Sequence, residues 1–312
     1  MTLVTGASGF LGQHVLAQFA GQPLRVLALP DDPARSELGK QAEVVTGDVT
    51  CLESLPPALE GITEVVHLAG FVNGGRGPAD TFMSVNAQGT ENLARAARAA
   101  GVTHFVYTSS ITVYGHVEDA DESAELVSTP GYAASKIDAE RRLQELLPGS
   151  ATILRLPLVL GAGDTGFLCP ALHGFRRIGR VTLVGSGQAP WSVLAASDAA
   201  RAIALCLELP ETRGGTYNVL GETVTNGELL RAVGAGAGCT SDIRLPEALA
   251  WGMATLSELV GRDDLTRGQV RALSRPLSMK ADRFAWLGFV PKVSWRDALA
   301  QGVAWCAENY DV

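Results

Sequence analysis

The sequence predicts an α/β fold of the Rossmann type, a doubly wound parallel sheet, with a smaller C-terminal α/β lobe. The first half alternates short β-branched runs with longer Ala- and Leu-rich periodic segments, which is the pattern of repeated βαβ units. A glycine-rich loop follows the first of these runs. At 312 residues the chain exceeds the size at which a single hydrophobic core usually stops growing. We therefore expect a larger domain over 1–160 and a second lobe over 161–312.

The elements of the first domain are expected from local patterns. Strands are expected at Leu3–Thr5, Leu24–Leu29, Glu43–Val45, Glu64–Leu68, His104–Thr108 and Ala151–Leu156. Helices are expected between them at Phe10–Ala20, Ala79–Ala100 and Tyr132–Leu147. Pro78 precedes the second helix and Gly101 follows it, which are the usual residues at a helix start and end.

Beyond Gly161 the periodic pattern becomes looser. Helices are expected at Ala195–Leu209, Asn226–Val233 and Pro246–Val260. Two late strands, Val181–Val184 and Thr216–Val219, could return to the edge of the parallel sheet, so the lobe boundary need not be a clean cut in sequence.

Composition and charge exclude several classes of function. No stretch offers the roughly 18 consecutive apolar residues that a membrane span requires. The formal charge of −8 comes without a basic run, so nucleic acid is not an expected partner. The first residues lead directly into the glycine loop and leave no room for a signal peptide, so we expect a cytoplasmic protein. A small-molecule substrate is the expected partner, and a homodimer stays open.

The cysteines carry no sign of a shared structural role. Their number is odd, they are widely scattered, and they form no C-x-x-C pair, which argues against a disulfide framework and against a zinc site. We expect no bound metal and buried, inert thiols at Cys51, Cys169, Cys206, Cys239 and Cys306.

The glycine loop reads Gly6-Ala7-Ser8-Gly9-Phe10-Leu11-Gly12 and lies between an expected strand and an expected helix. In a dinucleotide-binding loop the first glycine permits a tight turn, the second lets the backbone approach a pyrophosphate, and the third lets the helix pack closely on the strand. The phosphates then meet free N–H groups at the positive end of the helix. The spacing is G-x-x-G-x-x-G, and a purely structural turn is the alternative. The context predicts an NAD(P) site.

The end of the second expected strand bears on the choice of cofactor. A carboxylate at Asp31 would hydrogen-bond the ribose hydroxyls and repel a 2′-phosphate, which favours NAD. In the alternative, Asp31 and Asp32 form only a polar turn between prolines. Arg35 could still reach a phosphate, so NADP is not excluded.

Two further motifs connect the chain to a known family. Ser110 closes the run Phe105-Val106-Tyr107-Thr108-Ser109, and Tyr132-Ala133-Ala134-Ser135-Lys136 follows later. With these motifs the chain resembles the extended short-chain dehydrogenase/reductases, the superfamily of NAD-dependent epimerases and dehydratases, over nearly its whole length. The likeness also includes Gly47-Asp48-Val49, His67-Leu68-Ala69-Gly70, Val85-Asn86, Arg155-Leu156-Pro157 and Leu287-Gly288-Phe289.

The resemblance implies an NAD(P)-dependent oxidoreductase with Ser110, Tyr132 and Lys136 as catalytic residues. It implies that Asp48 and Val49 meet the adenine, that Leu68, Ala69 and Gly70 line the adenosine and pyrophosphate, and that Leu156 and Pro157 border the nicotinamide. It further implies that Asn86 holds the site's geometry and that Lys136 bonds the nicotinamide ribose. As alternatives, Asp48 is a turn residue and His67 a satisfied strand-end histidine.

The spacing of Tyr132 and Lys136 suits proton transfer. Residues four apart on a helix share one face. A phenol has an unperturbed pKa of about 10, and a neighbouring ammonium with the positive nicotinamide is expected to lower the pKa of Tyr132 toward neutrality. Ser110, or Thr112 as an auxiliary hydroxyl, would hold the substrate oxygen.

The substrate prediction depends on the C-terminal lobe. Its apolar segment, followed by Leu265-Thr266-Arg267, resembles the 3β-hydroxysteroid-dehydrogenase-like branch. Helical spacing of Leu245, Leu249, Met253, Leu256 and Leu259 would offer an apolar wall to a secondary alcohol or ketone. One alternative is a sugar-nucleotide epimerase or dehydratase, with phosphates bound by Arg176, Arg177, Arg180, Arg244 and Arg283. Another is a non-catalytic cofactor-binding sensor.

Overall fold

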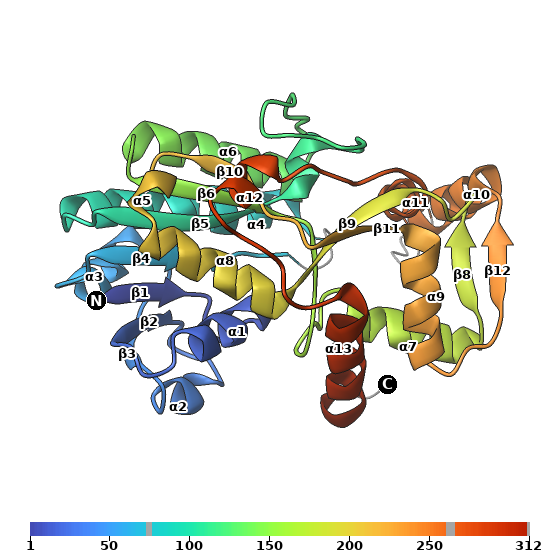
Figure 1. The fold of residues 1–312 in the computed structure, drawn as a ribbon, viewed down its shortest axis with the longest axis horizontal. Helices are drawn as coiled ribbons and strands as arrows, with labels where there is room; N and C mark the ends of the chain where they lie inside the picture. The colour runs from blue at the N-terminus through green and yellow to red at the C-terminus, as the bar shows by residue number, and fades with distance from the viewer. Residues whose placement is uncertain (73–76, 260–265, 311–312) are drawn as a thin grey trace.

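The computed structural model describes residues 1–72, 77–259 and 266–310. Among these residues the main sheet has seven strands in the order β10-β6-β5-β4-β1-β2-β3 (Figure 1). All neighbouring strands in it run parallel. The strand order reverses at β1, which pairs with β2 on one side and β4 on the other. The predicted doubly wound α/β fold is confirmed.

The first part of the chain contains the elements expected from the sequence and several short additions. Its strands are β1 (Thr2–Thr5), β2 (Leu24–Ala28), β3 (Glu43–Thr46), β4 (Glu64–His67), β5 (His104–Ser110) and β6 (Ala151–Leu156). Its helices and turns are α1 (Phe10–Gln18), α2 (Arg35–Leu38), η1 (Leu52–Ser54), α3 (Pro56–Leu59), α4 (Ala79–Phe82), η3 (Met83–Gln88), α5 (Gly89–Ala99), η4 (Ile111–Tyr114) and α6 (Tyr132–Leu146).

Much of the second part lies in the right-hand half of Figure 1, whereas its elements β10, α8 and α12 lie with the main sheet. Its strands are β7 (Leu158–Leu160), β8 (Val181–Val184), β9 (Pro190–Ala195), β10 (Thr216–Asn218), β11 (Glu222–Thr225) and β12 (Asp242–Leu245). Its helices are α7 (Leu168–Ile178), α8 (Ala196–Glu208), η5 (Pro210–Thr212), α9 (Asn226–Gly236), α10 (Glu247–Leu259), α11 (Arg267–Ser274), α12 (Asp282–Trp286) and α13 (Trp295–Asn309).

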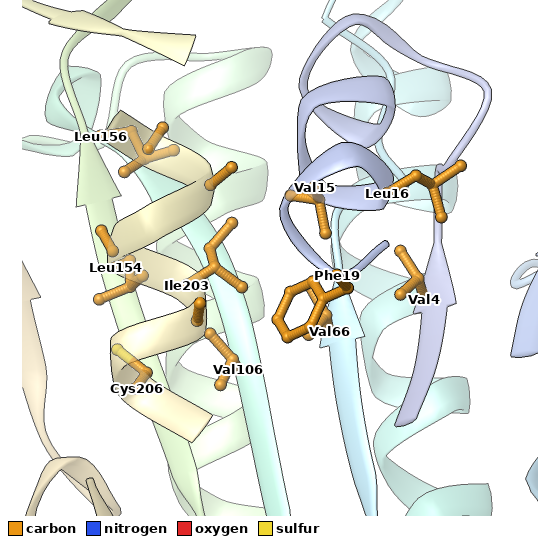
Figure 2. Close-up of a cluster of buried hydrophobic side chains, with 14 of the residues drawn as sticks. Val4, Val15, Leu16, Phe19, Val66, Val106, Leu154, Leu156, Ile203 and Cys206 are labelled. Carbon is orange, nitrogen blue, oxygen red and sulfur yellow. The ribbon is translucent and has the colours of Figure 1, made fainter. Parts of the chain in front are cut away.

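Side chains alternate between the two faces of the main sheet along each strand. Because both faces carry apolar side chains, helices cover both of them. Leu3, Val65 and Phe105 belong to the core shared with α5 and α6. Their sequence neighbours point to the opposite face, where α1 and α8 pack (Figure 2); examples are Val4, Val66 and Val106. Strands buried on both faces explain why the sequence shows continuous apolar runs there.

The two late strands take different positions. β10 pairs with β6 and extends the main sheet, so this part of the prediction is confirmed. Val181–Val184 does not reach that sheet, because it pairs in parallel with β12, a strand that the sequence analysis did not identify. The third sheet, of β11, β9 and β7, was also not predicted as a unit.

The predicted helix over Ala79–Ala100 has the right ends but an interrupted interior. Its middle, Met83–Gln88, is a π-helical turn between α4 and α5. Such turns shift the side chains that follow and are often found at functional sites. Periodicity at single-residue level does not reveal this change of pitch.

The cysteine prediction of buried free thiols is wrong at four of the five positions. Cys169 in α7 and Cys306 in α13 form a disulfide, with their Cα atoms 5.6 Å apart. The two residues are separated by 137 positions in the sequence, and only the packing of α7 against α13 brings them together. Cys51 is exposed and Cys239 half-buried, so Cys206 alone matches the expected buried free thiol.

The apolar residues expected to offer a wall to the substrate lie on an exposed face of α10. Leu249, Met253, Leu256 and Leu259 are 53%, 47%, 64% and 79% exposed, whereas α10 packs through Ala250 and Ala254. Leu245 belongs to β12 and not to the helix. Val260 and Leu265 lie outside the described residues.

No helix in the described ranges is long and apolar enough to cross a membrane.

Candidate functional site

The carboxyl ends of four neighbouring strands bring most of the predicted site residues to one edge of the main sheet. β1 ends before Gly6, β4 before Leu68, β5 at Ser110 and β6 before Pro157. These strands are consecutive in the sheet, with β4 and β5 in the middle. This edge, next to the reversal of strand order at β1, is where open α/β sheets bind ligands.

The glycine loop is compact because two of its glycines have no room for a side chain. At Gly6, with φ of +71°, a Cβ atom would lie 2.6 Å from the Ala69 nitrogen. At Gly12 a Cβ atom would overlap the Gly6 carbonyl oxygen and the Ala7 backbone. Gly9 differs from both, because it is exposed and its nearest neighbour would be the Gly6 oxygen at 3.3 Å. The fold itself therefore requires Gly6 and Gly12 more strictly than Gly9.

The helix that follows the loop suits a bound anion. α1 begins after Gly9, and in the described part of the chain no side chain caps its N-terminus and no acidic residue occupies its first turn. The N–H groups at such an end are available to phosphate oxygens. Ser8 is exposed, and Phe10 and Leu11 are half-buried beside it. The loop thus fits the pyrophosphate of a dinucleotide.

The acidic residues predicted at the adenosine end lie in turns and keep part of their surface exposed, whereas Val49 is buried. Asp31 is exposed after β2, and the carboxylate of Asp32 accepts a hydrogen bond from the Ala34 nitrogen at 2.9 Å. Asp48 accepts one from the Thr50 nitrogen at 2.8 Å, and Val49 is 7% exposed. The turn alternatives named for Asp32 and Asp48 therefore describe real contacts, while the role of Asp31 toward ribose stays a prediction.

Ser110 is oriented by a neighbouring threonine. The Ser110 Oγ accepts hydrogen bonds from the Thr112 nitrogen at 3.2 Å and from the Thr112 hydroxyl at 3.0 Å. Its own proton is therefore free to be donated toward Tyr132 or a substrate oxygen. Because the Thr112 hydroxyl donates its proton to Ser110, Thr112 orients Ser110 and has no hydroxyl proton left for a substrate oxygen.

Tyr132 is the first residue of α6 and lies beside the ring of Phe82. Its ring centroid is 6.0 Å from that of Phe82, which is 5.0 Å from that of Phe71. Burial raises the pKa of Tyr132 to about 12, against the opposing effect of its hydrogen bond with Ser110, although part of the residue remains exposed. The expected lowering of this pKa is thus not found in the protein alone, because loss of hydration outweighs the hydrogen bond with Ser110.

Lys136 lies one turn further along α6 and is 5% exposed. Its Nζ donates to the Thr108 carbonyl oxygen at 2.9 Å and lies 5.8 Å from the Tyr132 ring centroid. Burial lowers the pKa of Lys136 to about 8, and the negative charge of Glu140 acts in the opposite direction. A Cβ atom on Gly70 would lie 3.8 Å from this ammonium, so Gly70 and Lys136 border the same space.

Asn86 connects the π-helical turn to this space. Its amide accepts from the Phe71 nitrogen at 2.7 Å and donates to the Phe71 oxygen at 3.0 Å. It also donates to the Ser135 hydroxyl at 3.0 Å. One buried amide thus fixes the segment after β4 against α6, which carries Tyr132 and Lys136.

His67 is a satisfied strand-end histidine, as the alternative stated. Its Nδ1 lies 2.7 Å from the Thr5 hydroxyl and its Nε2 2.9 Å from the Thr90 hydroxyl. Burial, followed by the charge of Lys136, lowers the pKa of His67 to about 3. The imidazole is therefore neutral and links β1, β4 and α5.

Sequence reasoning missed a buried ion pair behind the catalytic candidates. Arg155 in β6 contacts Glu140 in α6 at 2.6 Å, and both side chains are less than a tenth exposed. Glu140 also accepts from the Ser109 hydroxyl at 2.5 Å, and Arg155 donates to the Tyr114 hydroxyl at 2.8 Å. An arginine inside an otherwise apolar strand is the signal that could have revealed it. Leu156 and Pro157 follow directly and are buried.

Comparisons with known proteins agree with this arrangement. Residues 2–219 match the NAD dependent epimerase/dehydratase family. The 2-alkyl-3-oxoalkanoate reductase of Stenotrophomonas maltophilia is 30% identical to this chain, and the alignment covers 95% of this chain and 96% of the reductase. A 3 beta-hydroxysteroid dehydrogenase/Delta 5-->4-isomerase of Mycobacterium tuberculosis is 32% identical over 45% of this chain and 40% of its own.

A solved structure aligns over nearly the full length. The dTDP-glucose 4,6-dehydratase DesIV of Streptomyces venezuelae, determined with NAD and TYD bound, superimposes with a TM-score of 0.79. It is 26% identical, and the alignment covers 99% of this chain and 97% of DesIV.

Proposed function

The chain belongs to the NAD-dependent epimerase/dehydratase family, and on this premise we propose that it is an NAD-dependent oxidoreductase acting on a secondary alcohol or ketone. The observation that carries the proposal is the meeting of Ser110, Tyr132 and Lys136 at the end of β5, beside the glycine loop. Gly6, Ser8, Gly9, Phe10, Leu11 and Gly12 would hold the pyrophosphate. The bound cofactor supplies hydride transfer at its nicotinamide.

The chain's own residues divide the remaining work. Ser110 holds the substrate oxygen through its free hydroxyl proton. Tyr132 donates its phenolic proton to that oxygen in the reducing direction, and its raised pKa keeps it protonated at neutral pH. Lys136 places a positive charge beside Tyr132 and favours the phenolate left behind. Asn86 holds the segment after β4 against the start of α6 through its hydrogen bonds.

A largely apolar substrate is favoured by the surroundings of Tyr132 and by one relative. Phe82, which is 1% exposed, packs beside the phenol ring, and the half-buried Phe71 packs on Phe82. The reductase that aligns with 95% of this chain acts, by its name, on a ketone that carries alkyl chains. The similarity to DesIV favours a second candidate, a sugar-nucleotide epimerase or dehydratase.

A paired measurement separates the two candidates. We expect the purified protein to oxidise NADH in the presence of bulky apolar ketones and to bind a UDP-hexose more weakly than micromolar. Micromolar affinity for the sugar nucleotide, about −8 kcal/mol, together with no ketone turnover would favour the epimerase. Cofactor binding without turnover of either substrate would favour a sensor.

A further inference from the structure

The ammonium of Lys136 has a second contact that the proposed mechanism does not use. Its Nζ lies 4.6 Å from the centroid of the Tyr107 ring, closer than the 5.8 Å to the Tyr132 ring. Tyr107 lies in β5, one residue before the carbonyl that accepts the Lys136 hydrogen bond. An ammonium within about 6 Å of an aromatic face is attracted by the ring's negative quadrupole.

The hydroxyl of Tyr107 contributes nothing comparable. Tyr107 is 1% exposed, and within the described residues its oxygen has no hydrogen-bond partner. The hydroxyl of Thr90, which is close to it, donates to the Asn86 carbonyl oxygen at 2.5 Å. A buried hydroxyl without a partner destabilises a fold. The contact of Tyr107 with Lys136 is made by its ring.

The ring itself is held in place by its neighbours. Tyr107 and His67 are register partners on adjacent strands, and their rings stack with centroids 5.5 Å apart at an angle of 28°. His67 is fixed in turn by Thr5 and Thr90. A neutral imidazole adds no charge that would repel the ammonium. The ring face offered to Lys136 is thus pre-organised by the sheet.

We propose that Tyr107 is a positioning residue, whose ring face holds the ammonium of Lys136 and stabilises its charged form. This role of Tyr107 goes beyond the proposed function, and only its kinetic test rests on the proposed ketone reduction. A buried lysine beside an aliphatic side chain would lose its proton at a lower pH than Lys136 does. The ring therefore extends the pH range over which Lys136 stays charged.

The other charged and titratable groups around Lys136 stay constant in the test. They are Tyr132 and Glu140 from α6 and His67 from β4. Arg155 from β6 belongs to the same group through its ion pair with Glu140, and Tyr114 from η4 through its hydrogen bond with Arg155. None is substituted. A shift that follows a change at Tyr107 alone therefore reports on the ring.

The test measures Lys136 directly. The chain has four lysines, Lys40, Lys136, Lys280 and Lys292, so NMR titration of protein labelled at the lysine side-chain carbons gives few signals, and Lys136→Met assigns the one of interest. With Tyr107→Leu we expect the Lys136 titration to move down by about half to one pH unit, which is the size of a cation–π contact converted to a pKa. Tyr107→Phe retains the ring and is expected to restore the wild-type value.

Two variants control for a general effect of a smaller core side chain. Phe105→Leu removes a buried ring two residues earlier in β5 and is expected to leave the Lys136 titration in place. Tyr107→Met replaces Tyr107→Leu if the latter fails to fold. An unchanged titration in Tyr107→Leu, or an equal shift in Tyr107→Phe, would overturn the proposal.

Turnover supplies a second readout. The alkaline limb of the pH profile for ketone reduction is expected to move with the Lys136 titration, since the rate falls as Lys136 loses its proton. If the protein turns over no ketone, the NMR titration still decides the role of Tyr107, and the failure belongs to the proposed function. If ketone is reduced and the titration does not move, only the role of Tyr107 is wrong.

Discussion

Replacing Tyr132 by phenylalanine is expected to reduce turnover by at least about a hundredfold, since a positioned acid or base usually contributes 10²–10⁴-fold. The substitution removes one oxygen atom and keeps the ring that contacts Phe82. Because that oxygen supplies the proton and does not hold the cofactor, NADH affinity is expected to change little. The measurements are the initial rate of ketone reduction and a fluorescence titration with NADH.

The matched control is Tyr310→Phe, the same chemical change at a residue that is 39% exposed near the end of the described chain. It is expected to behave as the wild type in both measurements. A Tyr132→Phe protein with near wild-type turnover would remove Tyr132 from the mechanism. If the Tyr132→Phe protein loses both NADH binding and turnover, the substitution disturbs the site as a whole.

Gly9→Ala is expected to lower NAD affinity at least about tenfold, which is ~1.4 kcal/mol, while the protein stays folded. The structure leaves room for this methyl group apart from a 3.3 Å approach to the Gly6 oxygen, and the φ of −76° at Gly9 suits any residue. The methyl group therefore meets little of the protein and would meet the pyrophosphate. Calorimetric titration with NAD and a thermal melt make the comparison.

Two other glycine substitutions make this result specific. Gly12→Ala is expected to lower the free energy of unfolding by about 1–3 kcal/mol, as overpacking does, because its Cβ atom would overlap the Gly6 oxygen. Gly174→Ala in α7 meets no atom within 4 Å and is expected to leave NAD affinity unchanged. Because alanine favours a helix interior, this substitution is expected to raise the free energy of unfolding by about 0.5–1 kcal/mol. Unchanged NAD affinity in Gly9→Ala would show that no phosphate approaches the loop there.

The first half of the fold was predictable because its signals are local. Strands buried on two faces read as apolar runs, and the glycine loop lies at one strand-to-helix junction. The edge of the sheet then follows from topology, since parallel strands bring Gly6, Leu68 and Ser110 to the same side. These positions required no knowledge of side-chain packing.

The features that were missed depend on contacts between distant segments. Cys169 and Cys306 meet only through the packing of two helices, and Glu140 finds Arg155 only across the α6–β6 contact. The pKa of Tyr132 follows from the balance between burial and its hydrogen bond with Ser110, which spacing along a helix cannot give. Helical spacing identified the apolar face of α10 but not that this face remains exposed.

The most direct test of the central claim follows a label from cofactor to substrate. Purified protein is incubated with NADH in which both hydrogens on the hydride-donating nicotinamide carbon are replaced by deuterium, together with the apolar ketone that is reduced fastest. The product is analysed by mass spectrometry. We expect one deuterium at the carbinol carbon for each NADH consumed, and no such product with Tyr132→Phe. Alcohol formed without deuterium, or label retained in NADH while a sugar nucleotide is converted, would contradict the account.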